Sequence, residues 1–133
     1  MWRFFVLLML GLSIHSCNSK AGKTNTQAAP VVKDISPDEF KNLSSKNEVL
    51  VIDVRTPEEI AEGYIEGADL FIDYNGCCFN EEVAKLDKNQ TYVVYCRSGG
   101  RSSNASDFMT KNGFKDVYNL KGGITHWNGT VVK

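Results

Sequence analysis

The chain has little of what marks a metal-binding or nucleic-acid-binding protein. It contains only two histidines, His15 and His126, and its four cysteines show no paired CxxC spacing. A structural zinc site needs four such ligands in close register, so we expect no metal and no other cofactor. Fifteen Lys and Arg residues stand against sixteen Asp and Glu residues, for a net charge of -1. That balance lacks the clustered positive charge on which nucleic-acid binding depends, so we expect no nucleic-acid partner.

A long hydrophobic run is also missing. The most apolar stretch, residues 4–12, follows Arg3 and is too short to cross a bilayer as a permanent helix. A short positive segment before such a run is typical of a signal peptide, which we predict over residues 1–16. The stretch ends in Ile14-His15-Ser16-Cys17, which resembles a bacterial lipobox, the motif whose cysteine is lipidated.

Lipidation of Cys17 would anchor an exported domain on the periplasmic side of a bacterial membrane, and this is the location that we predict. The alternative is a plain secretory signal with Cys17 incidental, which would give a free periplasmic protein. Residues 17–30 are polar and lack apolar periodicity, so they are predicted to form a flexible tether. Residues 31–133 then make one domain, with a length near the commonest domain size.

Signals for strands and helices alternate through this domain. Ser36 and Thr56 each precede a proline and lie three positions before a glutamate, which is the capping-box pattern of a helix start. Apolar runs such as residues 49–54 are typical of strands buried on both faces. The alternation predicts an α/β fold, with a mainly parallel five-stranded sheet and helices on both faces. The strands are predicted at residues 31–35, 49–54, 69–73, 91–95 and 117–119. One helix is predicted to start at residue 36 and a second to run from residue 56 to Gly63. Two more are predicted at residues 80–86 and 101–112, and a last helical turn should hold Trp127.

The strongest chemical signal lies between a predicted strand and a predicted helix, in the segment Cys96-Arg97-Ser98-Gly99-Gly100-Arg101-Ser102. Parallel sheets bind ligands beyond the carboxyl ends of their strands, where this segment is expected. The N-terminus of the next helix and the N–H groups of a glycine-containing turn favour negative charge there. Together with Arg97 and Arg101, they should stabilise the thiolate of Cys96, which is the nucleophilic form. We therefore predict a reactive Cys96 rather than a buried, inert cysteine.

Four motifs, in order along the chain, resemble those of single-domain rhodaneses. Residues 95–102, Tyr-Cys-Arg-Ser-Gly-Gly-Arg-Ser, are similar to the active-site loop of that family. The likeness extends over residues 35–127, and four motifs at the family's spacing make chance similarity improbable. The other three motifs are residues 51–59, residues 63–68, and residues 119–124 with Trp127.

The resemblance implies a sulfurtransferase that moves sulfane sulfur from thiosulfate, a persulfide or a polysulfide to a thiol or to cyanide. Cys96 would be the catalytic residue and would carry the sulfur as a persulfide. The partners are then a small-molecule sulfur donor and a thiol acceptor. Arg97 is expected at the pocket mouth, whereas Arg101 would turn inward and brace the loop. The substrate-binding residues implied are Arg97, Ser98, Gly99, Gly100 and Arg101.

Residues around the loop are interpreted as structural. Asp53 and Arg55 lie at the end of the neighbouring predicted strand and should order the loops beside the site. Trp127 is expected to pack in the core. Tyr64 and Glu66 stand where the family usually has His and Pro, so the rim of the pocket should differ in detail.

Two other classes stay open. A cysteine phosphatase or arsenate reductase uses a cysteine, five intervening residues and an arginine that grips phosphate oxygens. Here Ser102 occupies the arginine position and Arg101 comes one residue early. A non-catalytic module of the rhodanese type usually lacks the cysteine that this chain keeps. The loop therefore favours the sulfurtransferase.

Cys77 and Cys78 are unusual for the family. They follow a predicted strand, so they should lie at the same edge of the sheet as Cys96. Three roles compete for them: packing as small apolar residues beneath the loop, resolving the Cys96 persulfide, or bonding to each other. A bond between adjacent cysteines would be easily reduced.

Overall fold

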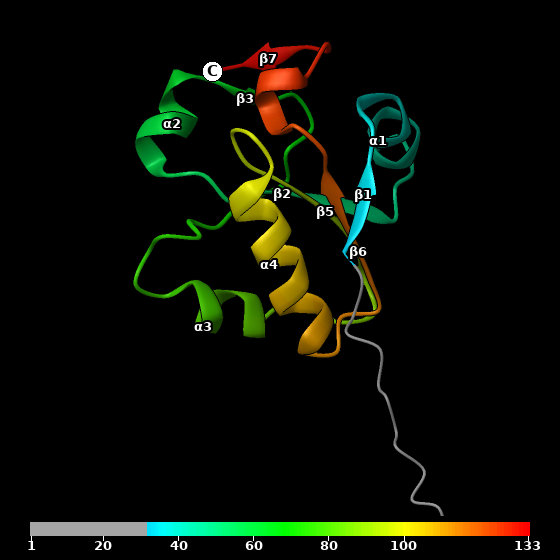
Figure 1. The fold of residues 1–133 in the computed structure, drawn as a ribbon, viewed down its shortest axis with the longest axis vertical. Helices are drawn as coiled ribbons and strands as arrows, with labels where there is room; N and C mark the ends of the chain where they lie inside the picture. Colours follow the sequence, from blue (N-terminus) through cyan, green and yellow to red (C-terminus); the bar gives the residue numbers. More distant parts are fainter. Residues whose placement is uncertain (1–31) are drawn as a thin grey trace, which may run out of the picture.

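The computed structural model describes residues 32–133, and the predicted signal peptide, tether and Cys17 lie outside the described residues. Its centre is a five-stranded sheet in the order β1-β6-β5-β2-β4, and every neighbouring pair is parallel (Figure 1). The predicted fold class is therefore confirmed. The strands of this sheet are β1 (Lys33–Ile35), β2 (Val49–Asp53), β4 (Leu70–Phe71), β5 (Thr91–Tyr95) and β6 (Asp116–Leu120).

Helices follow the strands, and two of them begin as predicted. Ser36 and Thr56 are N-caps, and in each capping box the glutamate three positions later, Glu39 or Glu59, accepts a hydrogen bond from the backbone N–H of the cap. Each box satisfies N–H groups that the first helical turn leaves without partners. The helices are α1 (Pro37–Ser44), α2 (Pro57–Glu62), α3 (Phe79–Ala84), α4 (Gly100–Lys111) and the 3-10 turn η1 (Gly123–His126).

The sheet separates two apolar cores. Neighbouring residues of one strand point to opposite faces, so Val93 belongs to one core and Val94 to the other. The first core packs under α3 and α4, with Phe79 and Met109 among its residues. The second packs under α1 and η1, where Trp127 meets Phe40 edge-to-face at 4.9 Å. Trp127 thus packs against the core, although it follows the last helical turn instead of lying in it.

A second, smaller sheet was not predicted. It consists of β3 (Tyr64–Ile65) and β7 (Val131–Val132), which pair antiparallel. Figure 1 shows this two-stranded sheet beside the C-terminus, near α2 and η1. Strands of two residues give no periodicity to detect, and their pairing joins distant parts of the sequence. The strand β4 is shorter than the predicted strand at residues 69–73.

Candidate active site

Cys96 lies directly after β5, and α4 begins four residues later. The chain must reverse tightly in between, and Gly99 makes this possible as the N-cap of α4, with a φ of 106°. That conformation is open to glycine and costly for other residues. The turn brings the start of α4 back over the Cys96 side chain, which is only 1% exposed.

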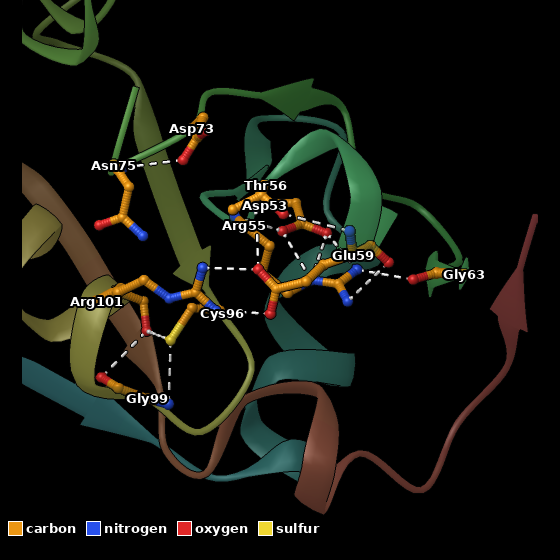
Figure 2. A network of polar contacts seen from close by, with 11 residues as sticks. Asp53, Arg55, Thr56, Glu59, Gly63, Asp73, Asn75, Cys96, Gly99 and Arg101 are labelled. Atoms are coloured by element: carbon orange, nitrogen blue, oxygen red, sulfur yellow. Dashed lines mark hydrogen bonds and ion pairs between the residues drawn. The ribbon is translucent and has the colours of Figure 1, made fainter. Parts of the chain in front are cut away.

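Two groups of the loop and helix donate hydrogen bonds to the sulfur of Cys96 (Figure 2). The Gly99 N–H lies 3.1 Å from Sγ, and the Ser102 hydroxyl lies 3.3 Å from it. Burial alone would raise the pKa of the thiol, but hydrogen bonds from Ser102 and from the N–H groups of Gly99 and Ser98 outweigh burial and lower this pKa. The site therefore favours the thiolate.

The loop is fixed from behind by the turn η1. Ile124 donates its N–H to the Cys96 carbonyl at 2.9 Å, and Thr125 donates both its N–H and its hydroxyl to the Arg97 carbonyl, at 3.0 and 2.7 Å. Gly123 lets these backbones approach, because a Cβ there would overlap the Cys96 carbonyl and the Arg97 backbone. These contacts hold the loop in one conformation.

Arg101 turns away from the solvent and pairs with Glu59 of α2. Its two terminal nitrogens lie 2.7 and 2.8 Å from the two carboxylate oxygens, as a bidentate fork (Figure 2). The hydrogen bonds from Arg101 lower the pKa of Glu59 to about 2, against the opposing effect of burial. Because its guanidinium is engaged in this way, Arg101 connects the active-site loop to α2 instead of facing an incoming ligand.

Asp53 and Arg55 form a buried ion pair at the end of β2. Arg55 Nη2 lies 2.8 Å from Asp53 Oδ2, and the two side chains are 5% and 0% exposed, respectively. The same Nη2 donates to the Gly63 carbonyl at 2.7 Å, and Nη1 donates to the Glu59 carbonyl at 3.4 Å. The pair therefore positions α2, and α2 in turn presents Glu59 to Arg101.

Arg97 and Ser98 form the exposed part of the loop. Within residues 32–133, no hydrogen bond or ion pair engages the Arg97 guanidinium. Arg97 borders a cavity of about 210 Å³ whose other walls include Thr125 and, from α2, Glu62. A charge that is free and exposed beside the loop can attract an anion, in contrast to the engaged charge of Arg101.

Cys77 and Cys78 occupy the turn before α3, where they are bonded to each other and exposed. Of the three roles left open for this pair, the structure has the mutual bond, and the exposure of both residues contradicts packing as small apolar residues. Phe79 fills the core position instead, and this turns the two preceding residues outward. Cys96 is a free cysteine, so the predicted resolving role stays a prediction.

Two residues of the site were not predicted from the sequence. Ser102 belongs to the loop motif, but nothing in the sequence indicates that its hydroxyl donates to Cys96. Glu59 was recognised as a capping residue only, because its pairing with Arg101 spans 42 positions. The glutamate in fact serves both purposes, since Oε2 accepts from the Thr56 N–H and from Arg101.

Neither a metal site nor a membrane span emerges from the described part of the chain. Residues 32–133 contain no cluster of three or more metal-ligating side chains. No helix in the same range is long and apolar enough to cross a bilayer.

Comparison with known proteins places this site in a family. The model of the rhodanese-like domain matches residues 36–130. Thiosulfate sulfurtransferase GlpE of Pseudomonas putida is 31% identical over 98 residues, which cover 74% of this chain and 86% of that protein. A sulfurtransferase of Allochromatium vinosum is 36% identical over 87 residues, which cover 65% of this chain and 78% of that one. A solved rhodanese-like domain protein from Staphylococcus aureus has 36% identity and a TM-score of 0.63, and the match covers 73% of this chain and 92% of that one. The chain belongs to the rhodanese-like domain family.

Proposed function

We propose that this protein transfers sulfane sulfur through a persulfide on Cys96. The observation that supports this function is the pair of hydrogen bonds that Cys96 Sγ accepts from the Gly99 N–H and the Ser102 hydroxyl. Both bonds favour the thiolate, which is the form that attacks sulfur. Relatives that bear the name sulfurtransferase support the same reaction class.

The reaction has two displacement steps. The Cys96 thiolate attacks the outer sulfur of a donor such as thiosulfate, a new S–S bond forms, and sulfite leaves with the electron pair of the broken bond. A thiolate, or cyanide in an assay, then attacks the terminal sulfur, and the electron pair returns to Cys96. The N–H groups of the loop would stabilise the negative terminal sulfur between the two steps, as an oxyanion hole stabilises oxygen.

Access and charge favour a small anionic donor. The Cys96 side chain is 1% exposed, so a donor with a narrow sulfur end fits the loop better than a bulky one. The exposed guanidinium of Arg97, which no residue in the range 32–133 engages, would guide an anion toward the loop.

Phosphate esters are expected to be very poor substrates. A cysteine phosphatase needs an arginine that grips the phosphate oxygens, and the arginine of this loop, Arg101, is engaged by Glu59. Hydrolysis of an aryl phosphate that disappears in the Cys96→Ser variant would favour a cysteine phosphatase over a sulfurtransferase.

The mass of the full-length chain tests the function. Thiosulfate should add one sulfur atom per chain, cyanide should remove it, and peptide mapping should locate it on Cys96. The Cys96→Ser variant should take up no sulfur from thiosulfate. Sulfur uptake that is unchanged in this variant would contradict the proposal.

We also infer that the domain is exported and held on a membrane through lipidated Cys17, because residues 14–17 resemble a lipobox. The full-length chain should then partition with membranes, and Cys17→Ala should release it or block its maturation. A mature N-terminus without lipid, at a residue other than Cys17, would leave only an ordinary signal peptide.

A further inference from the structure

The Cys77–Cys78 bond cannot serve the purposes that disulfides and cysteines usually serve. A disulfide stabilises a fold by closing a loop of the unfolded chain, and the effect grows with the length of that loop. Here the two residues are adjacent, with Cα atoms 3.8 Å apart, so no loop is closed. Both residues are exposed, so neither fills the core. Stability therefore gives no reason for this pair.

The residues on either side of Cys77 and Cys78 fix the position of the disulfide and keep it exposed. Phe79 is buried and packs edge-to-face on Tyr74 at 5.1 Å, and it also contacts Phe108 of α4 at 5.7 Å. On the other side, Gly76 donates its N–H to the Asp73 carbonyl at 3.1 Å and closes a tight turn. The disulfide is thus presented to solvent on an anchored segment.

A cavity lies directly beside one of the two sulfur-bearing residues. It has a volume of about 310 Å³ and is lined by Cys77, by the three aromatic side chains just named, and by Asn80 and Glu81. Among residues 32–133, no basic side chain lines it and Glu81 contributes the only formal charge of its walls. Such a cavity suits a small sulfur nucleophile of low charge and disfavours a dianion.

We propose that the Cys77–Cys78 disulfide is a second sulfur-reactive site, beyond the function proposed for Cys96, at which hydrogen sulfide is captured as a persulfide. The hydrosulfide ion attacks Cys77 Sγ from the cavity and forms a new S–S bond. The bond between Cys77 and Cys78 breaks, and its electron pair leaves on Cys78 as a thiolate, which takes a proton from water. Two electrons pass from the sulfide to the disulfide, so no other oxidant is needed for this step.

Hydrosulfide and sulfite are the probes that test the site, because both open exposed disulfides and only sulfite is a dianion. The full-length chain is oxidised in air, mixed with sodium sulfide, and quenched with iodoacetamide before peptide mapping. The peptide with both cysteines should carry one extra sulfur, on Cys77, and an alkylated Cys78. A peptide that stays disulfide-bonded, or an extra sulfur on Cys78, would overturn the proposal.

Variants separate this site from Cys96. Cys96→Ser should keep the full gain of sulfur on the Cys77 peptide. Cys78→Ala leaves a lone thiol at Cys77. Isolated as the reduced monomer before sulfide is added, this variant has no S–S bond for sulfide to break at Cys77, so it should gain no sulfur there. The Cys96 peptide of the unmodified chain, loaded with thiosulfate in parallel, reports on the proposed function independently. If the Cys77 peptide gained no sulfur in the Cys96→Ser variant, the pair would only receive sulfur from Cys96. This result would contradict the proposal that the pair is an independent site.

Glu81 supplies the test of charge. Glu81→Gln should speed opening of the disulfide by sulfite by roughly threefold at low salt, because one nearby negative charge is removed from the path of a dianion. Opening by hydrogen sulfide, which is partly uncharged, should change less. The exposed Glu48, which does not line this cavity, provides the matched control as Glu48→Gln. Equal rates for sulfite in all three proteins would contradict the role of the cavity.

Discussion

Cys96 and the Cys77–Cys78 pair both follow strands of one parallel sheet, yet the fold gives them opposite surroundings. Cys96 is buried beneath a loop whose N–H groups and Ser102 hydroxyl stabilise its charge. The pair is exposed on a turn before α3, beside a cavity with an acidic residue and no basic one. The first sulfur is therefore prepared as a nucleophile, and the second pair, once oxidised, as an electrophile.

The difference shows that residue type does not decide sulfur chemistry. Both segments contain cysteine and glycine next to the first turn of a helix. The loop after β5 is fixed from behind by hydrogen bonds from Ile124 and Thr125, whereas the turn before α3 is anchored by the buried Phe79. The support from Ile124 and Thr125 keeps the hydrogen-bond donors on Cys96. A turn without such donors leaves its cysteines to react with one another.

The largest effect should come from removing one site at a time. Cys96→Ser should lower the rate of sulfur transfer from thiosulfate to cyanide by roughly 10³-fold or more, because the nucleophile is lost. The double variant Cys77→Ala/Cys78→Ala should leave this rate unchanged. A large loss in the double variant would show that the two regions act as one site.

Ser102→Ala should have the next largest effect. Loss of a hydrogen bond to a charged group costs about 1.5–3 kcal/mol, so the apparent pKa of Cys96 should rise by roughly one to two units. Alkylation of Cys96 by iodoacetamide, followed against pH, measures this change. The midpoint should lie below about 8.5, the usual pKa of cysteine, in the unmodified chain, and should move upward in the variant.

Ser103→Ala is the control for that measurement. Ser103 is the next residue of α4, and among the described residues its hydroxyl donates no hydrogen bond to the Cys96 sulfur. An equal midpoint in the unmodified chain and the Ser102→Ala variant would mean that the backbone N–H groups suffice to stabilise the thiolate.

Much of the fold could be predicted from local pattern. The run at residues 91–95 became β5 with those bounds, and both capping boxes start helices, because these signals depend on neighbouring residues. The β3–β7 sheet could not be predicted, since it joins two-residue strands far apart in the sequence. Its pairing is decided by the packing of the whole domain.

The site was predicted in its position and less well in its physics. The arginines were expected to stabilise the thiolate with their charge, and the charge of Arg101 does interact favourably with Cys96. Arg101 is engaged by Glu59, and the largest contributions that lower the pKa of Cys96 are hydrogen bonds. The sequence shows that two arginines are near, but not which carboxylate folds against one of them from 42 positions away.

Arg97→Ala sharpens the contrast in charge between the two regions. The KM for thiosulfate should rise by roughly three- to tenfold at low ionic strength, because an exposed charge beside the loop is lost, and added salt should reduce the difference. Transfer from an uncharged persulfide donor should change little. Arg97→Lys should restore most of the affinity for thiosulfate, whereas an equal loss with both donors would point to a damaged loop.

The smallest effect is expected from Glu59→Gln, which breaks the link between α2 and the loop while keeping a side chain that can complete the capping box. The lowering of the Glu59 pKa corresponds to roughly 3 kcal/mol, but the ion pair is partly exposed and solvent screens it, so its loss should lower the free energy of unfolding by about 0.5–1 kcal/mol at pH 7. Denaturant titration of the variant and the unmodified chain measures this difference.

The pH dependence identifies the ion pair as the cause. The pKa of Glu59 is lowered in the folded state to about 2, so its stabilisation is complete above the unfolded value of about 4.3 and is lost as the pH falls toward about 2. The difference between the two proteins should therefore vanish over that interval. Glu58→Gln, at an exposed position of the same helical turn, should show no such convergence. A difference that persists unchanged at pH 2 would assign the effect to packing of the Glu59 side chain, and the loop over Cys96 would then owe its position to η1 alone.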